Sequence, residues 1–542
     1  MDAVTTPPAI TNEPIHSYAP GTAETASLQD RLKAMAADTA ELTVTIGGRT
    51  RMGGGAVFDV VAPHAYRQVL GTAAHSTHED TTAAIDAALA AAPAWRDLPF
   101  DERAAVFLRA ADLLSTTWRD TMNAATMLGQ SKTAQQAEID AACELADFWR
   151  FNVKFARQIL ADQPISGPQV WNRMDYRPLE GFVLAITPFN FTAIGGNLPS
   201  APALMGNTVV WKPSPTQTLS AFYTMRLLEA AGLPDGVINL LTGDGQPVSQ
   251  VALAHPGLAG IHFTGSTATF QHLWRTVGEN ISGYAGYPRL VGETGGKDFV
   301  IAHSSADPAA VVTGLVRGAF EYQGQKCSAA ARAYLPRSLW DGGLRDQLVS
   351  TTESLTYGDV TDFTNFGGAV IDRRSFDKLS GVLDAARADS SVQVLAGGTY
   401  DQREGFFVRP TVLESSETTH DIFRTEYFGP ILSVHVYDDA DYSATLARID
   451  SDTPYALTGA VFARDRAAIE EASKTLRFGA GNFYVNDKPT GAVVGQQPFG
   501  GARSSGTNDK AGSMLNLLRW VSPRALKETF VSATEHTYPH MG

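Results

Sequence analysis

The sequence predicts an α/β protein with two doubly wound parallel-sheet units and a small projecting sheet. From residue 181 to about residue 485, short apolar runs alternate with helical patterns. Such alternation is typical of parallel strands covered by helices on both faces. The chain has 542 residues, and a single hydrophobic core stops growing near about 250–300 residues. At least two α/β units are therefore expected.

The part of the chain before residue 181 is predicted to be mostly helical. Residues 1–25 are rich in Pro, Thr and Ala and should form an extended arm. Apolar side chains recur at helical spacing in residues 78–93, 100–120 and 132–160. Cys143 lies on the apolar stripe of the last of these helices, and we expect it to be a core residue, because a free cysteine packs like a small hydrophobe.

Two alternating sets of elements follow. The first set has strands at 181–187, 208–211, 236–241 and 261–263, with helices at 194–205, 216–231 and 246–254. The second set opens with a strand at 298–302, a helix at 308–322 and a strand at 331–335. Residues 172–177 and the tail after Arg519 fit neither set, so we expect them to form the projecting sheet.

Composition excludes several classes of function. The chain has 43 Lys and Arg against 57 Asp and Glu, a net charge of −14, which disfavours nucleic-acid and anionic-membrane partners. Two cysteines are too few for a disulfide framework or a thiolate metal cluster. The sequence has no secretory signal and no run of apolar residues long enough to span a membrane. A cytoplasmic location is therefore expected.

Several common site motifs are missing. We find no G-x-G-x-x-G, no P-loop, no H-E-x-x-H and no G-x-S-x-G motif. The 12 histidines do not have the spacing of metal ligands. No bound metal is expected.

Two residues carry the chemical argument. Cys327 lies in a glycine-containing turn beside Lys326, whose charge would favour the thiolate. Taken alone, Cys327 is more simply explained as an inert thiol. Glu293 ends a predicted strand and is followed by Gly295 and Gly296, which permit close backbone approach to a ligand. An acid at a strand end is also common, so each residue by itself leaves the function open.

Seven motifs, in order along residues 187–501, resemble those of the aldehyde dehydrogenase superfamily. They are TPFNF (187–191), WKPS (211–214), FTGS (263–266), ETGGK (293–297), GQKCS (324–328), EYFGP (426–430) and PFGG (498–501). Residues 175–196, 263–274, 323–330 and 491–509 are in addition similar to the Δ1-pyrroline-5-carboxylate dehydrogenase subfamily. Phe270 replaces a glycine of the wider superfamily and is usual in this subfamily.

The resemblance implies NAD-dependent oxidation of L-glutamate γ-semialdehyde, which is in equilibrium with Δ1-pyrroline-5-carboxylate, to L-glutamate in proline catabolism. Cys327 would attack the aldehyde carbon. The side-chain amide of Asn190 and the backbone N–H of Cys327 would hold the oxyanion. After hydride transfer to NAD, Glu293 would act as general base for hydrolysis of the thioester.

The resemblance also assigns cofactor contacts. Lys212 would lie near the adenosine ribose, and Glu426 near the nicotinamide ribose. The helix that starts after Gly265 would hold the pyrophosphate at its N-terminus. The full implied set is Thr187, Lys212, Gly265, Ser266, Thr267, Ala268, Thr269, Glu426 and Phe428. NAD is preferred over NADP, because Pro213, Ser214 and Pro215 follow Lys212 and no second cation stands ready for a 2′-phosphate.

For the substrate, the resemblance implies an anchor for the α-carboxylate opposite Cys327. Ser328 and the backbone amides of Gly491 and Ala492 would hold that carboxylate, since amides at a glycine can form an anion nest. Phe191 and Phe499 would flank the aliphatic middle of the substrate. A loop glycine and two core phenylalanines are the ordinary alternative explanation.

Domains and partners are expected by the same analogy. Residues 1–296 would hold the NAD-binding domain, with 165–180 in an oligomerisation flap, 297–505 the catalytic domain, and 506–542 a segment returning to the NAD-binding domain and the flap. A homo-oligomer, either a dimer or a dimer-based hexamer, is expected. The residues before position 78 are too few for a (β/α)₈ barrel of about 250 residues, so a separate proline dehydrogenase would supply the substrate through transient contact.

Two alternatives remain open at this point. The chain can be read as another NAD(P)-dependent semialdehyde dehydrogenase or a CoA-acylating relative, although CoA-acylating relatives lack the general base and Glu293 is present. It can also be read as a catalytically retired structural protein of the same fold. Retention of Cys327, Glu293 and Asn190 together argues against the second alternative.

Overall fold

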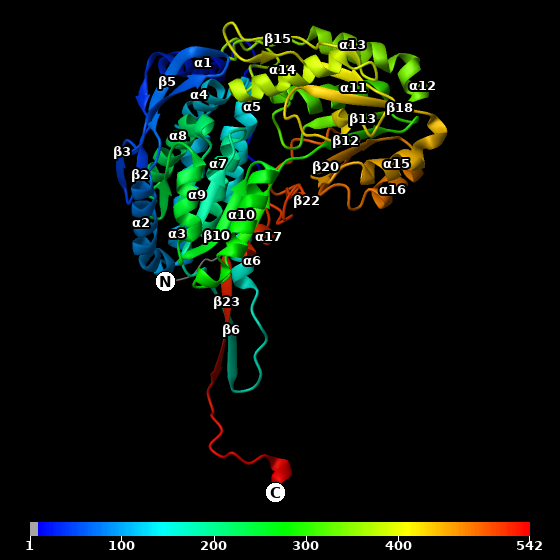
Figure 1. Ribbon diagram of the computed structural model, residues 1–542. Helices are drawn as coiled ribbons and strands as arrows, with labels where there is room; N and C mark the ends of the chain where they lie inside the picture. The colour runs from blue at the N-terminus through cyan, green and yellow to red at the C-terminus, as the bar shows by residue number, and fades with distance from the viewer. Residues whose placement is uncertain (1–8) are drawn as a thin grey trace.

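The computed structural model describes residues 9–542 and has two lobes with a ribbon projecting from the first (Figure 1). The first lobe is built on a seven-stranded sheet of order β11-β10-β7-β8-β9-β2-β3. Its strands are β2 (Val44–Ile46), β3 (Arg49–Arg51), β7 (Phe182–Thr187), β8 (Thr208–Pro213), β9 (Ile238–Leu240), β10 (Leu258–Thr264) and β11 (Arg289–Glu293). The five strands β11 to β9 are parallel, as the alternating pattern predicts.

Helices cover both faces of this sheet. Phe182 and Leu184 of β7 pack with α2 (His78–Asp97), α9 (Gly245–Ala254) and α10 (Thr267–Glu279). Val183 and Ala185 point to the other face, against α3 (Phe100–Ser115), α6 (Leu145–Ala161), α7 (Thr192–Leu204) and α8 (Thr218–Ala230). Successive strand residues thus enter two different cores, which is why these strands are continuous apolar runs.

The second lobe repeats this architecture. Its sheet has the order β14-β17-β18-β13-β12-β20-β21, and only β14 is antiparallel. The strands are β12 (Asp298–Ala302), β13 (Ala330–Pro336), β14 (Gln393–Ala396), β17 (Thr411–Glu414), β18 (Ile431–Tyr437), β20 (Thr458–Phe462) and β21 (Asn482–Val485). α11 (Pro308–Phe320) and α13 (Arg345–Ser354) cover one face, and α15 (Tyr442–Ser451) and α16 (Arg466–Thr475) cover the other. α14 (Arg373–Ala388) packs in a further cluster.

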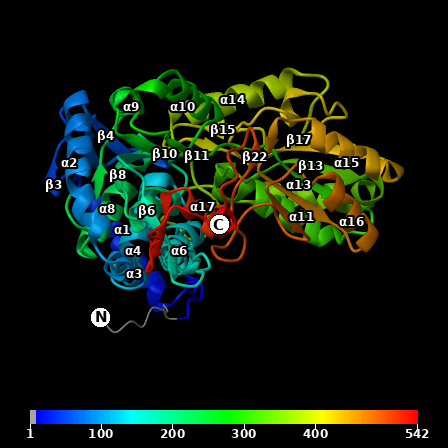
Figure 2. The same ribbon diagram turned by 90° about the horizontal axis from the view of Figure 1, so that it is seen from below.

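The projecting sheet is a two-stranded antiparallel ribbon. β6 (Val170–Pro178) pairs along its whole length with β23 (Val521–Thr529), and Val521 lies opposite Pro178. The chain reaches β23 through α17 (Met514–Leu518), which lies beside α6 in the first lobe, and Figure 2 shows this returning segment between the lobes. The expected pairing of these two segments is confirmed.

Several elements differ from the prediction. The segment expected as one helix over 132–160 is α5 (Ala134–Ala137), a π-helical turn (Glu138–Glu144) and α6. The helix expected over 100–120 ends at Ser115, and α4 (Arg119–Gln130) follows it. Apolar spacing does not locate these breaks, because apolar residues next to them, such as Met122 and Ala141, pack into the same core as residues of α3 and α6. Cys143 is buried, as expected.

The segment before residue 78 is more ordered than the sequence indicates. Residues 1–8 lie outside the described part, residues 9–19 have no regular structure, and α1 (Ala23–Ala37) ends the expected arm early. A small sheet follows, of β1 (Ala40–Glu41), β4 (Val57–Ala62) and β5 (Ala65–Ala74). Within residues 9–542, no helix combines the length and apolarity needed to cross a membrane.

Candidate active site

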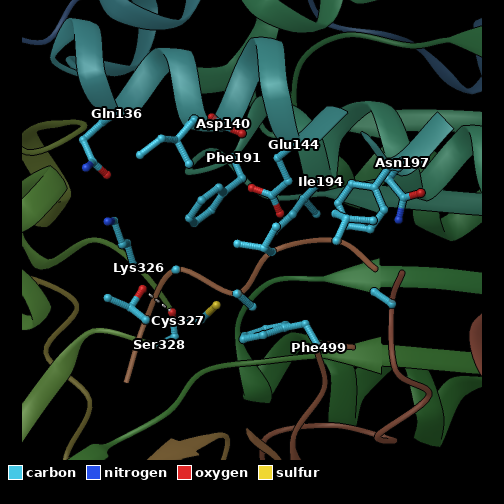
Figure 3. Close-up of a pocket in the computed structure, with 18 of the residues that line it drawn as sticks. Gln136, Asp140, Glu144, Phe191, Ile194, Asn197, Lys326, Cys327, Ser328 and Phe499 are labelled. Atoms are coloured by element: carbon cyan, nitrogen blue, oxygen red, sulfur yellow. Dashed lines mark hydrogen bonds between the residues drawn. The ribbon is translucent and has the colours of Figure 1, made fainter. Parts of the chain in front are cut away.

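A cavity of about 650 Å³ lies where the two lobes meet, and its lining comes from both. The first lobe supplies residues of the π turn, α7 and the ends of β10 and β11, and the second supplies the Cys327 turn and the loops that follow β21. Figure 3 shows Cys327 and Ser328 facing Phe191, Glu144 and Phe499 across this space. In α/β proteins, ligands bind at the carboxyl ends of parallel strands, and β7, β10 and β11 end here.

The turn that carries Cys327 is shaped by its backbone. Tyr322 and Gln323 have left-handed φ angles of 50° and 53°, and Gly324 has φ +63°. A Cβ atom on Gly324 would lie 2.3 Å from the carbonyl oxygen of Gly429, so only glycine fits. This close approach brings the Cys327 turn against the segment that holds Glu426.

Two hydrogen-bond donors lie at the Cys327 turn. Asn190 Nδ2 donates to the carbonyl oxygen of Gln325 over 3.1 Å, with its side chain buried. The backbone N–H of Cys327 has no acceptor in another residue of the described chain. One amide of Asn190 and one main-chain amide thus lie at the same turn, which is the arrangement that an oxyanion needs.

The surroundings of Cys327 correct one expectation. Burial raises the pKa of its thiol well above the usual value, and the neighbouring Glu293 and Asp298 carboxyls raise it further. The expectation that Lys326 favours the thiolate is wrong, because Lys326 Nζ pairs with Glu321 over 3.1 Å. The thiol therefore needs a base to take its proton.

Glu293 ends β11, as predicted, and lines the same cavity. Its Oε1 accepts a hydrogen bond from the Gly501 N–H over 2.9 Å. Burial raises the pKa of Glu293 to about 8. A carboxylate with a pKa near the working pH has the property that a general base requires.

The glycines after Glu293 join three parts of the site. A Cβ atom on Gly295 would lie 2.0 Å from Glu426 Oε2, and one on Gly296 would lie 2.7 Å from the carbonyl oxygen of Cys327. The N–H of Gly296 donates to Glu426 Oε1 over 3.0 Å. Phe428 follows with a left-handed φ of 60°. The diglycine thus permits the contact between Glu426, Cys327 and the end of β11.

The residues expected to bind the cofactor lie at the carboxyl edge of the first sheet. Lys212, on β8, is buried, its Nζ donates to the carbonyl oxygen of Gly243 over 2.8 Å, and burial lowers its pKa to about 8. Ser266 caps α10 by accepting the Thr269 N–H over 3.2 Å. Gly265, Thr267 and Ala268 complete that turn. Its free N-terminal amides suit an anionic group.

Thr187 is placed differently from the other expected cofactor residues. It ends β7, but its side chain is buried. Its Oγ1 accepts from Trp211 Nε1 over 3.0 Å and donates to Gln217 Oε1 over 3.1 Å. The hydroxyl therefore supports the sheet edge, and its one hydrogen is already donated to Gln217, which the sequence pattern could not indicate.

The residues expected to bind the substrate carboxylate lie together. Ser328 Oγ is 2.8 Å from Thr490 Oγ1, so the two hydroxyls share a hydrogen bond. Gly491 has φ +92°, a conformation that favours glycine. Within residues 9–542, neither the Gly491 N–H nor the Ala492 N–H has a hydrogen-bond acceptor. All four residues line the cavity, so two unpaired amides and a hydroxyl are available to an anion.

Sequence reasoning missed a buried charge cluster beside the cavity. Lys132 Nζ and Asp140 Oδ2 are 2.7 Å apart, with both side chains inaccessible. Asp140 also accepts the N–H groups of Thr192 and Ala193 at the start of α7, over 2.9 and 2.8 Å. The Lys132 ammonium lies 4.0 Å from the centre of the Phe191 ring. This pair fixes the helix start that follows Asn190 and Phe191.

Glu144 is a second residue that the sequence analysis did not select. It lines the cavity, and burial raises its pKa to about 8. The signal in the sequence was the set of acids Glu138, Asp140 and Glu144 inside a segment expected to bury one face. Only the apolar positions of that segment entered the prediction. Within residues 9–542, no group of His, Cys, Asp and Glu side chains could hold a metal ion.

The chain matches known proteins over its full length. The aldehyde dehydrogenase family profile matches residues 51–521. A Schizosaccharomyces pombe protein named probable delta-1-pyrroline-5-carboxylate dehydrogenase is 50% identical over 537 residues, 98% of each chain. A human protein named delta-1-pyrroline-5-carboxylate dehydrogenase, mitochondrial, is 46% identical, and the match covers 98% of this chain and 94% of the human protein.

Solved structures agree with this result. The Mycobacterium tuberculosis Delta-pyrroline-5-carboxylate dehydrogenase bound with NAD has a TM-score of 0.97 and 63% identity, with both chains covered to 100%. A Thermus thermophilus 1-pyrroline-5-carboxylate dehydrogenase mutant has a TM-score of 0.90 and 31% identity, over 96% of this chain and 99% of that one. With the site geometry above, these matches show that the chain belongs to the aldehyde dehydrogenase family.

Proposed function

We propose that this chain oxidises L-glutamate γ-semialdehyde to L-glutamate with NAD as the hydride acceptor. The named activity of the relatives and the NAD bound in the Mycobacterium tuberculosis structure support this proposal. The observation that carries it is the pair of unpaired amides at Gly491 and Ala492, which lie with Ser328 in the cavity of Cys327. An aldehyde that bears a carboxylate at its far end fits this arrangement, because its aldehyde carbon can meet Cys327 while its carboxylate binds the two amides.

The first chemical step takes place at Cys327. Its thiol gives its proton to a water molecule in the cavity and the sulfur adds to the aldehyde carbon, which places a negative charge on the former carbonyl oxygen. That oxygen accepts hydrogen bonds from the Cys327 N–H and from Asn190 Nδ2, which has a second hydrogen beyond the one it donates to Gln325. The oxyanion then re-forms its carbonyl as a hydride leaves the same carbon, which keeps the Cys327 sulfur in a thioester; NAD held at the first sheet would supply the hydride acceptor.

Glu293 serves the second step. It lines the cavity beside Cys327 and raises the pKa of that thiol, so the two side chains are close enough to act together. In its ionised form Glu293 takes a proton from water, the hydroxide oxygen adds to the thioester carbon, and the thiol leaves. The product is L-glutamate.

The residues at the first sheet fit a dinucleotide. The N-terminal amides of α10 are available to a pyrophosphate. Lys212 lies on β8 of the same sheet, and Glu426 of the second lobe accepts the Gly296 N–H just beyond β11. Gly245 lies close beneath Lys212, where a Cβ atom would be 3.3 Å from Lys212 Cε. Phe428 would pack beside the nicotinamide ring.

The domain division, assembly and location are proposals of the same kind. Residues 1–296 would bind NAD, 297–505 would carry the catalytic thiol, and 506–542 would return to the first domain and the ribbon. A homo-oligomer built through the ribbon, a separate proline dehydrogenase as source of substrate, and a cytoplasmic location complete the proposal. Several eukaryotic relatives are named mitochondrial, so location can differ between family members.

The test is the replacement of each cysteine in turn. Cys327→Ala should abolish NADH formation from L-glutamate γ-semialdehyde and leave NAD binding intact, because the nucleophile is lost and the cofactor edge is not. Cys143→Ala is the matched control and should leave activity nearly unchanged, since Cys143 is a buried residue of the π turn. An inactive Cys143→Ala enzyme, or an active Cys327→Ala enzyme, would overturn the assignment of the nucleophile.

A further inference from the structure

The segment that carries the two unpaired amides, residues 491–497, packs Val494 into the core of the first lobe but makes few hydrogen bonds to the rest of the protein. We call it the anchor loop. Inside it, the Val493 carbonyl accepts the N–H groups of Gln496 and Gln497 over 3.0 Å each, and the Val493 N–H donates to Gln497 Oε1. These bonds give the loop its shape. They do not fix its position relative to Cys327.

The N-terminal arm, residues 9–22, supplies the missing connection. Asn12 Nδ2 donates to the carbonyl oxygen of Val494 over 2.8 Å, and Asn12 Oδ1 accepts from Gln496 Nε2 over 2.9 Å. In the described part of the chain, every hydrogen bond between the anchor loop and the rest passes through this one amide. The arm is therefore the polar link between the loop and the body of the protein.

The side-chain amide of Asn12 is also hydrogen-bonded to the core helix α6. Asn12 Nδ2 also donates to Asp147 Oδ2 on α6 over 2.8 Å, and Asp147 Oδ1 accepts the N–H of Glu13 over 2.8 Å. Two hydrogens and the oxygen of Asn12 are all engaged, so the orientation of the amide is determined. Asn12 thus joins a core helix to the anchor loop.

Ion pairs and a hydrogen bond hold the arm in place on the C-terminal side of this contact. The Glu13 carboxylate pairs with Arg119 over 2.7 Å and with Arg150 over 2.6 Å, and its side chain is only 10% exposed. Further along, Tyr18 donates to Glu138 over 2.9 Å. Ile15, Ser17 and Tyr18 reach the lining of the cavity. A segment bound this firmly can position a loop that binds it.

We propose that the N-terminal arm is a clasp for the substrate carboxylate and that Asn12 is its positioning residue. Asn12 does not touch the substrate. It sets the place of the Gly491 and Ala492 amides through Val494 and Gln496, and so contributes to selection of aldehydes that carry a carboxylate. This inference rests on the proposed function, because it needs a substrate whose far end is an anion.

The test compares two aldehydes in an isosteric variant. Asn12→Asp keeps the shape of the side chain but cannot donate to the Val494 carbonyl, which is left buried without a partner. We expect kcat/KM for L-glutamate γ-semialdehyde to fall about tenfold, mainly through KM, and the inhibition constant of L-glutamate to rise by a similar factor. Activity with hexanal and KM for NAD should not change. Thr11→Ala, an exposed neighbour on the arm, is the control and should match the wild type.

A double variant separates the loop from the arm. When Asn12→Asp is combined with Asp147→Asn, the amide introduced on α6 donates to the carboxylate introduced on the arm. The arm then stays tied to α6 while the Val494 carbonyl still lacks its donor. The proposal predicts that the semialdehyde defect persists. Recovery of wild-type KM in the double variant would overturn it, because the Val494 contact would then be irrelevant.

Other outcomes are also decisive. Equal loss with hexanal and semialdehyde, or no loss with either, would contradict a role in carboxylate selection. If Asn12→Asp fails to fold, Asn12→Ala removes the same donor without adding a charge and is judged by the same comparison. A wild-type enzyme that does not distinguish the two aldehydes would refute the proposed function itself, which separates that failure from failure of the clasp.

Discussion

Burial determines the protonation states of the two reacting side chains, Cys327 and Glu293. The Cys327 thiol has its pKa raised by burial and by nearby carboxyls, and burial raises the pKa of Glu293 to about 8. Near neutral pH most Glu293 side chains are therefore protonated. The motifs predicted which residues meet, but the proton states depend on solvent exclusion by both lobes, which no motif contains.

The ionisation of Glu293 should determine how kcat depends on pH. A general base acts in its ionised form, and the ionised fraction of Glu293 grows as pH rises through about 8, so kcat should increase from about pH 7 and level off above about pH 9. In Glu293→Gln the increase should vanish. A single burst of NADH should precede slow turnover, because hydride transfer occurs before the step in which Glu293 activates water. Stopped-flow absorbance of NADH measures both.

Two results would contradict this role for Glu293. One is a wild-type kcat that is flat across the same pH range. The other is loss of the burst in a folded Glu293→Gln enzyme, which would extend its role to the acylation step.

At the scale of elements, the strands were predictable and the helix before them was not. β7, β8 and β12 are buried on both faces, so their sequences are continuous apolar runs. The π turn at Glu138–Glu144 was not predicted, because the contacts that this turn makes are polar and the prediction used apolar spacing. It directs Asp140 to Lys132 and to the first amides of α7, and these contacts join segments that are distant in sequence.

Removal of one partner of the buried Lys132–Asp140 ion pair should lower the stability of the folded protein. Lys132→Met leaves the buried Asp140 carboxyl without its partner, and such a change typically destabilises a protein by about 3–5 kcal/mol. Lys33→Met is the matched control, because the Lys33–Asp30 pair is exposed and exposed pairs contribute about 0–1 kcal/mol. The denaturant midpoint of unfolding should fall in Lys132→Met only, and equal midpoints in the two variants would contradict this account.

At the scale of the molecule, the chain crosses between its two lobes and returns. The last segment packs Trp520 and Val521 into the core of the first lobe and then forms the ribbon with β6. Residues 172–177 and the tail fitted no α/β pattern in the sequence, and that misfit is what indicated the ribbon. The contact between the arm and the anchor loop could not be predicted, since a single asparagine 482 positions away carries it.

The ribbon exposes apolar side chains, and the proposed homo-oligomer would cover them. Trp171 and Phe530 are 51% and 63% exposed, and clustered exposed apolar groups are typical of association surfaces. Phe530→Asp should shift the mass measured by light scattering toward that of one 57.9 kDa chain. Phe478→Asp, at a 74% exposed phenylalanine outside the ribbon, should leave the mass unchanged. Dissociation by the second variant alone would place the interface elsewhere.

Discrimination between aldehydes tests the central claim most directly. With NAD fixed, kcat/KM should be measured for L-glutamate γ-semialdehyde, succinate semialdehyde and hexanal. An aldehyde without a carboxylate leaves the Gly491 and Ala492 amides unpaired, and sites of this kind can reject such analogues by about 10⁴-fold. L-glutamate γ-semialdehyde should therefore exceed hexanal by orders of magnitude, with succinate semialdehyde between them and L-glutamate a competitive inhibitor. Comparable values for the semialdehyde and hexanal would contradict the account.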